Sequence, residues 1–79
     1  MKYIITFGSA HLKDFNINPA KTALIVQGND EFNARDKVFN FNGINDNFCT
    51  SYEYSDISKF EKLGFKEVTL DELEELRKC

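Results

Sequence analysis

The sequence has few of the residues that cross-link small proteins or bind metals. Its 79 residues include two cysteines, Cys49 and Cys79, and one histidine, His11. A secreted domain of this size normally carries four or more cysteines, so we predict reduced thiols and a cytoplasmic protein. Cys49 lies in an apolar stretch and is expected to be a small buried side chain. Because His11 and the two thiols are far apart in the sequence, no metal site and no cofactor are predicted.

Long hydrophobic runs and glycine-rich loops are also missing from the sequence. The longest uninterrupted apolar run is only a few residues, whereas a membrane-spanning helix needs about 20. The opening Met-Lys-Tyr-Ile-Ile-Thr becomes polar too soon for a signal peptide, so we expect none. The four glycines, at positions 8, 28, 43 and 64, all fall at predicted ends of strands or helices. They therefore predict turns and not a phosphate-binding loop.

The sequence also lacks an excess of positive charge. Ten Lys and Arg stand against 13 Asp and Glu, which gives a formal net charge of -3. Residues 71–79 hold four acids and two bases, and residues 1–70 hold nine acids and eight bases. Most of the net charge therefore lies at the C-terminal end. Without a basic face, binding to duplex nucleic acid has little electrostatic support.

Large aromatic side chains are plentiful in the sequence. Eight Phe and three Tyr contribute to a hydrophobic fraction of 42%, which is ordinary for a globular domain. Each of these rings can bury about 150–250 Å². We therefore predict one folded domain, residues 1–79, with an aromatic core.

Hydrophobic periodicity predicts seven short elements. Strands are expected at residues 2–7, 22–27, 48–54 and 65–68, and helices at residues 30–40, 56–62 and 70–78. The order β-β-α-β-α-β-α predicts a small α+β domain, in which a sheet of about four strands is covered on one face by helices. The order of the strands within the sheet stays open.

Several of these segments carry local signals. Strand 2–7 is apolar on both faces, which is typical of a central strand, whereas the charged strand 65–68 is typical of an edge. Ser55 is expected to cap the helix at 56–62. Thr69 and Glu72 have the spacing of a capping box at the start of the last helix. Asn42-Gly43 is expected to end the helix at 30–40 in a left-handed cap.

The long polar connection at residues 9–21 contains the first candidate site. His11 is a possible general base or ligand-binding donor, and Asp14, three residues on, has the spacing to orient it. The alternative interpretation, which we favour, is a loop histidine that bonds backbone or water. No serine or cysteine is tied to this pair by local spacing.

Arg35 is the second candidate. It falls inside an apolar arc of the helix at 30–40, an arc that includes Phe32, Phe39, Ala34 and Val38. One interpretation is that Arg35 binds an anion or an acidic partner. The favoured alternative is that its stem covers the core edge while its guanidinium reaches water.

Two further surfaces are candidates for binding. Tyr52 and Tyr54 alternate along one face of their strand, which is compatible either with a binding platform or with core against the helix at 30–40. Glu72, Glu74 and Glu75, together with Asp71, make the last helix acidic. Such a helix is usually a solvated face, and the sharper hypothesis is that it meets a basic surface.

The opening Tyr3-Ile4-Ile5-Thr6-Phe7-Gly8, followed by His11, resembles the start of a group of small phage and prophage proteins of unknown function. In that group a strand ending in Thr-Phe-Gly precedes a histidine, and a second strand, a helix and an aromatic strand follow. The resemblance covers about the first two-thirds of the chain. It implies a phage accessory protein in a bacterial cytoplasm, without a known activity. Small acidic phage proteins that block host nucleases are similar in size and charge.

These observations favour a non-enzymatic module that binds a protein partner, and an inhibitor of a host defence or nucleic-acid-binding protein is one form of this hypothesis. The alternatives are a small ligand-binding or enzymatic domain centred on His11 and Asp14, and single-stranded nucleic-acid binding on an aromatic sheet face. The lack of a basic face makes nucleic acid the weaker partner. The open edge of the sheet also offers a place where a second copy could pair to form a homodimer.

Overall fold

The four strands form one mixed sheet in the order β3-β1-β2-β4. In this computed structural model, which describes residues 1–8 and 12–78, the strands are β1 (Lys2–Thr6), β2 (Thr22–Gln27), β3 (Ser51–Glu53) and β4 (Lys66–Thr69). β1 pairs antiparallel with both β2 and β3, and β4 runs parallel to β2. The predictions that strand 2–7 is central and strand 65–68 lies at an edge are both confirmed.

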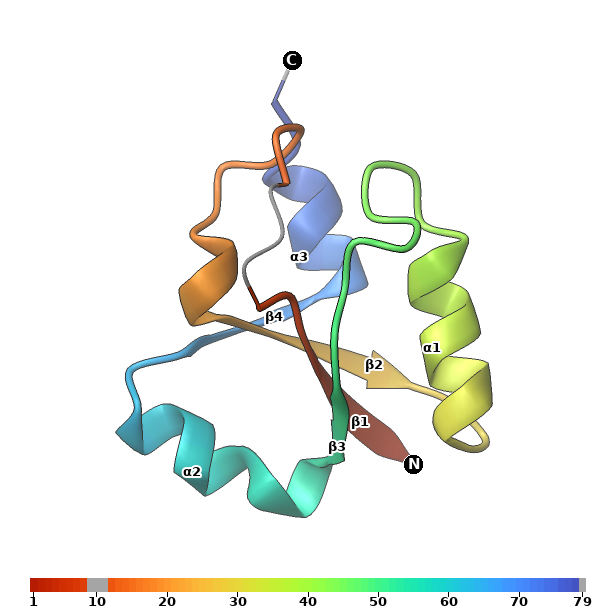
Figure 1. The fold of residues 1–79 in the computed structure, drawn as a ribbon, viewed down its shortest axis with the longest axis vertical. Helices are drawn as coiled ribbons and strands as arrows, with labels where there is room; N and C mark the ends of the chain where they lie inside the picture. The colour runs from red at the N-terminus through yellow and green to blue at the C-terminus, as the bar shows by residue number, and fades with distance from the viewer. Residues whose placement is uncertain (9–11, 79) are drawn as a thin grey trace.

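Within the described residues, three helices complete the fold (Figure 1): α1 (Glu31–Phe39), α2 (Ile57–Lys62) and α3 (Leu70–Glu75). The element order and the α+β class are those that the sequence predicts. A short 3-10 turn at Pro19–Lys21 precedes β2, and its cap Asn18 accepts a hydrogen bond from the Ala20 backbone N–H. Asn favours turns through such side-chain bonds and Pro through its fixed φ, so the Asn18-Pro19 pair is a local signal that the structure follows.

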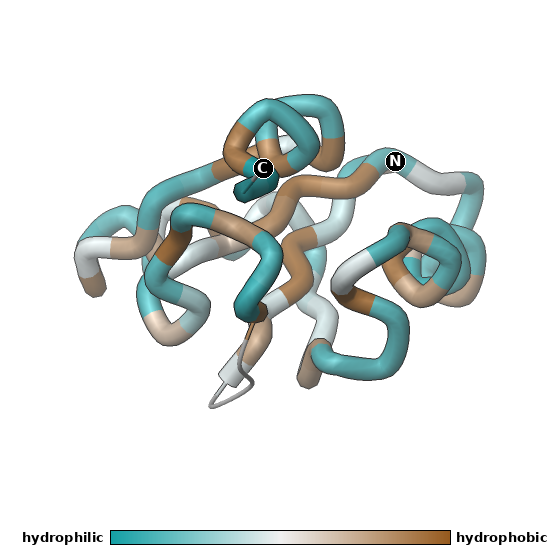
Figure 2. Tube along the Cα trace, turned by 90° about the horizontal axis from the view of Figure 1, so that it is seen from above, coloured by the Kyte–Doolittle hydropathy of each residue, from teal (hydrophilic) through white to brown (hydrophobic). Residues whose placement is uncertain are grey.

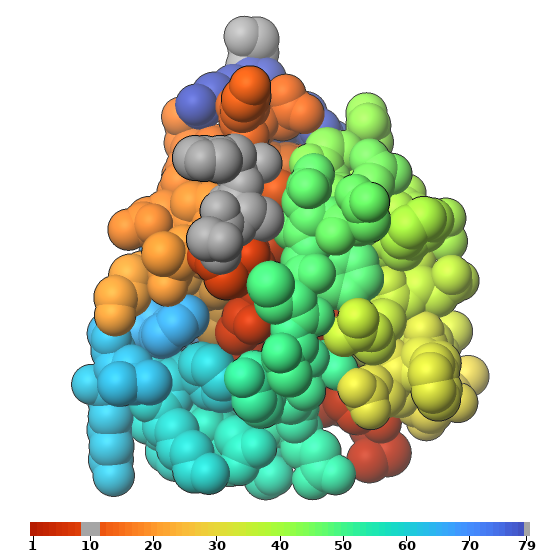
Figure 3. Space-filling model, in the orientation of Figure 1, coloured from red at the N-terminus to blue at the C-terminus, as the bar shows by residue number. Residues whose placement is uncertain are grey.

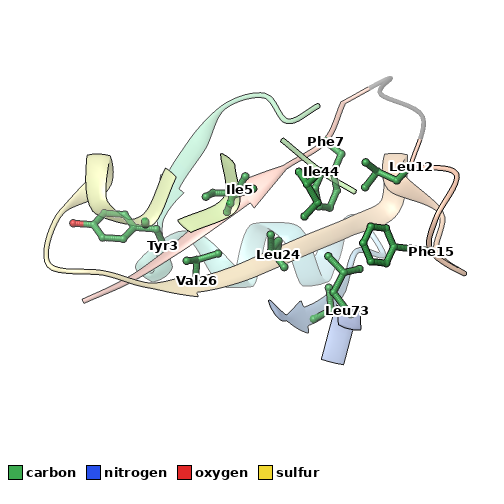
Figure 4. Packing of buried hydrophobic residues seen from close by; sticks show 12 residues of the cluster. Tyr3, Ile5, Phe7, Leu12, Phe15, Leu24, Val26, Ile44 and Leu73 are labelled. Carbon is green, nitrogen blue, oxygen red and sulfur yellow. The ribbon is translucent and has the colours of Figure 1, made fainter. Parts of the chain in front are cut away.

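The main core lies between the sheet and the pair α1 and α3. Side chains from β1, β2, β4, α1 and α3 meet there, and Phe15 and Ile44 from the connections close one end (Figure 4). Phe15 is 1% exposed and Ile44 is fully buried. In Figure 2 the central strands are hydrophobic along much of their length, while the outer turns are mostly hydrophilic. α1 and α3 therefore form the predicted layer of helices over one face.

The opposite face of the sheet is partly covered by α2. Ile4 is fully buried on this face, and its strand partner Tyr52 packs edge-on against Phe60 of α2, with ring centroids 5.1 Å apart. Phe60 in turn contacts Phe65 at 5.2 Å. None of residues 57–62 is fully buried. α2 therefore stabilises this face through aromatic edges and not through a deep core.

Several predicted element boundaries are wrong. The strand predicted at 48–54 is only Ser51–Glu53, since Tyr54 starts a 3-10 turn that leads into α2. Asp56, not Ser55, occupies the N-cap of α2, without a side-chain bond. The helix predicted at 70–78 ends at Glu75. The residues after it pair with an earlier segment instead: Arg77 forms an isolated antiparallel β-bridge with Phe15, and the Lys78 N–H donates to the Asp14 carbonyl at 2.7 Å.

Two other expectations are also corrected. α1 ends at Phe39, before Gly43, which has a φ of 101° within the following turn and not at the helix cap. Cys49 is exposed and not buried. Its Sγ lies 3.6 Å from the Phe7 carbonyl oxygen, beside the turn at Gly8. Cys79 lies outside the described residues.

Candidate functional site

The candidate site is built on α1, which begins at a well-made cap. Asp30 accepts a hydrogen bond from the Asn33 backbone N–H at 2.8 Å, and the Asn33 side chain accepts one from the Asn29 N–H at 3.1 Å. These bonds satisfy backbone donors that a helix start leaves free. One face of the helix is anchored by Ala34 and Val38, which are both fully buried against the sheet. The other face of α1 therefore points outward from a fixed position.

Two phenylalanines lie on that outward face. Phe32 is 81% exposed and Phe39 is 50% exposed, and they are seven residues apart, so they share one side of the helix. A shallow hollow of about 510 Å³ lies beside them and is lined by Phe32, Asn33, Arg35, Asp36, Phe39 and Phe48. We call these six residues the α1 surface. α1 itself occupies one side of the molecule, next to the segment that leads into β3 (Figure 3).

The sequence placed Phe32 and Phe39 in one apolar arc with Ala34 and Val38. The structure buries only the half of the arc that faces the sheet, because the sheet and the turn after α1 contact just that side. Phe32 and Phe39 are thus the binding candidates that the sequence did not single out. Their signal was the width of the arc, which is larger than one sheet contact can cover.

Arg35 ties α1 to the segment before β3. Its Nη1 donates to the Cys49 carbonyl at 3.1 Å and to Ser51 Oγ at 3.4 Å, and the guanidinium stacks on the Phe48 ring at 4.9 Å. Ser51 in turn donates to a carboxylate oxygen of Glu31. Arg35 is half-buried, so its stem covers apolar surface, but its guanidinium also binds protein atoms.

The charges on the α1 surface have no ion-pair partner within residues 1–8 and 12–78. The two salt bridges found there join Lys59 to Asp56 and Arg77 to Glu74. Asp36 is exposed, and Arg35 bonds only to neutral groups. One unpaired cation and one unpaired anion therefore border the two exposed phenylalanine rings.

The structure does not test the proposed pairing of His11 and Asp14, because His11 lies outside the described residues. Asp14 is exposed, and its backbone carbonyl accepts the hydrogen bond from Lys78 described above. This contact joins the connection before β2 to the end of the chain. It gives Asp14 a structural role through its backbone.

Tyr52 and Tyr54 lie on the far side of the sheet from α1. Tyr52 pairs with Ile4, whose side chain points away from the α1 layer, so Tyr52 packs on α2 and not on α1. It is 39% exposed. Tyr54 is half-buried, and Lys2 Nζ lies 5.3 Å from its ring centroid. The tyrosines therefore do not form one platform with Arg35.

The acidic side chains of α3 are all exposed, but two of them have local partners. Glu72 completes the capping box with Thr69, as predicted. Glu74 binds Arg77, and this hydrogen bond lowers the pKa of Glu74, with partial desolvation opposing it. Asp71 borders a separate hollow of about 330 Å³ that also contacts Lys2. The acidic residues therefore form a solvated face, in which Glu72 caps α3 and Glu74 binds Arg77.

Among residues 1–8 and 12–78, no group of three His, Cys, Asp or Glu side chains is placed to hold a metal ion. No helix in this part of the chain has the length and apolarity needed to cross a membrane. Comparisons of the chain with protein-family models, curated protein sequences and solved structures found no match.

Proposed function

We propose that this protein is a non-enzymatic interaction module that binds another protein through the α1 surface. The observation that supports the proposal is the exposure of Phe32, 81%, beside a half-exposed Phe39 and the Phe48 ring. Aromatic side chains and arginine are enriched where proteins bind one another. An apolar cluster rimmed by charged and polar groups is the usual form of such a site.

The polar groups of the surface support a binding role. Arg35, Ser51 and Glu31 bond to one another or to the Cys49 carbonyl, which fixes β3 against α1. The backbone that carries the rings is therefore held in place, and little backbone ordering is left to oppose binding. The resemblance to small phage and prophage proteins extends the proposal to a bacterial host protein as the target, with inhibition of that protein as the effect.

Affinity capture from bacterial lysate tests the proposal. The protein is immobilised at low density and compared with a Phe32→Ser variant. We expect Phe32→Ser to reduce the captured partner at least about 10-fold, because a central aromatic contact is often worth about 2 kcal/mol. The fold is expected to persist, since the Phe32 side chain is mostly in solvent.

The matched control is Leu63→Ser. Leu63 is also a large exposed hydrophobic residue, at 61%, but it lies at the end of α2 on the other face of the sheet. This variant is expected to capture the partner as the unmodified protein does. Equal capture by both variants would show that the α1 surface is not the binding site.

A further inference from the structure

Charges flank the phenylalanine pair of α1 on opposite sides. At 3.6 residues per turn, Phe32 and Phe39 lie within about 20° of each other around the helix axis. Arg35 lies about 50° to one side of their midline, and Asp36 lies about 50° to the other side. The helix therefore presents an apolar line with a cation along one edge and an anion along the other.

Two copies of this helix face are complementary when a two-fold axis parallel to the helix relates them. A two-fold axis parallel to α1 places Phe32 on Phe32 and Phe39 on Phe39 of a second copy. It also brings the Arg35 edge of each copy against the Asp36 edge of the other, which forms two ion pairs. An antiparallel pair would instead place the Arg35 edges of the two copies together and the Asp36 edges together, so that like charges meet. We infer that a second copy of this chain occupies the α1 surface in a parallel two-fold dimer.

The groups needed for this pairing are available. Asp36 and Arg35 form no salt bridge within residues 1–8 and 12–78. Both hydrogen bonds of Arg35 in that part of the chain use Nη1, which leaves Nη2 and Nε to bind a carboxylate. α1 lies at one side of the molecule (Figure 3), so a second copy can approach it.

The size of the helix indicates that the dimer is weak. A nine-residue helix is only about 13 Å long, so the contact lies at the small end of protein interfaces. We expect a dissociation constant of about 10–100 µM, in the range of transient complexes. This inference goes beyond the proposed function, with which it shares the surface: at high concentration the dimer covers the rings, and a partner protein competes with the second copy.

Sedimentation equilibrium of the purified chain from about 10 µM to about 1 mM tests the inference. The mean mass is expected to rise from 9.2 kDa toward twice that value. Phe32→Ser is expected to stay monomeric, and Leu63→Ser is expected to dimerise as the unmodified chain does. A chain that stays monomeric throughout, or a dimer that persists in Phe32→Ser, overturns the inference.

Asp36→Asn tests the orientation of the two helices. In the parallel dimer this substitution removes an ion-pair partner from both contacts, so the dissociation constant is expected to rise about 3- to 10-fold. In an antiparallel dimer it would remove a repulsion, and dimerisation would strengthen. Stronger dimerisation of Asp36→Asn therefore overturns the parallel arrangement.

Partner binding and dimerisation through the α1 surface can be told apart by their outcomes. A monomeric chain whose capture from lysate depends on Phe32 keeps the proposed function and removes the dimer. A Phe32-dependent dimer without a captured partner keeps the dimer and removes the proposed function.

Discussion

Arg77 joins three segments that are far apart in the sequence. Its Nη2 donates to the Asn42 carbonyl at 2.9 Å, and its guanidinium stacks on Phe15 at 4.8 Å and on Phe41 at 5.5 Å. Its Nε also donates to Glu74. The sequence shows Arg77 only as one of two bases in an acidic segment. Its aromatic and carbonyl partners come from the loops around α1 and β2, which no local pattern relates to it.

We expect Arg77→Met to lower the free energy of unfolding, since it removes the bond to Asn42 and the cationic stacking while keeping apolar volume. Glu74→Gln is expected to lower it much less, because an exposed ion pair contributes little. Urea denaturation of both variants measures the difference. Equal losses would show that the ion pair, and not the loop contacts, gives Arg77 its role.

The pH dependence of this pair follows from the same contacts. Arg77 lowers the pKa of Glu74 from its ordinary value of 4.5. The folded pKa is therefore below the unfolded pKa, so the contribution is complete above pH 4.5 and fades as the pH falls through the folded pKa. The Glu74→Gln effect is thus expected to be present at neutral pH and to vanish in acid, which denaturation at both pH values would check.

The elements themselves follow local signals wherever a cap is encoded in a few residues. Asp30 begins α1 and the Thr69–Glu72 capping box begins α3, because each cap needs only a side chain and a backbone N–H three residues on. The end of α3 follows distant contacts instead. α3 stops at Glu75 because residues 77 and 78 bond to the segment around Phe15, which lies about 60 residues earlier in the chain.

The capping box gives a prediction for α3. Thr69→Ala removes the acceptor for the Glu72 N–H, so the free energy of unfolding is expected to fall by about 1 kcal/mol. Glu75→Ala is the control, because Glu75 is exposed and an acid at the C-terminal end of a helix is not favoured. It is expected to be neutral or slightly stabilising. Chemical denaturation compares the two, and an unchanged midpoint for Thr69→Ala would contradict a stabilising cap.

At the scale of the whole molecule, the class of the fold was predictable and the pairing of its strands was not. The alternation of strands and helices restricts a chain of 79 residues to a small sheet with helices on it. The parallel pairing of β4 with β2 depends on how the chain from β3 through α2 crosses the sheet. The α1 surface was missed for the same reason: periodicity shows an apolar arc, and only the sheet's position decides which half is buried.

The two faces of the sheet differ in the depth of their packing, and this predicts where the molecule opens first. On the α1 side of the sheet, β1 and β2 hold the fully buried Ile5 and Leu24, whereas residues 57–62 of α2 include no fully buried residue and Leu63 after them is 61% exposed. Local opening costs least where few apolar contacts are lost. We therefore expect the amides of α2 to exchange with solvent deuterium at least about 100-fold faster than those of β1 and β2, and faster than those of α1.

Hydrogen exchange followed by NMR at a protein concentration below that of dimerisation measures these rates residue by residue. Leu63→Ser is expected to leave the pattern unchanged, since that side chain is already in solvent. Phe60→Ala is expected to speed exchange in α2 further and to extend it to β3, because Phe60 packs on Tyr52. If α2 exchanged as slowly as the central strands, its aromatic edge contacts would have to belong to the cooperative core. The second face of the sheet would then contribute as much to folding as the first.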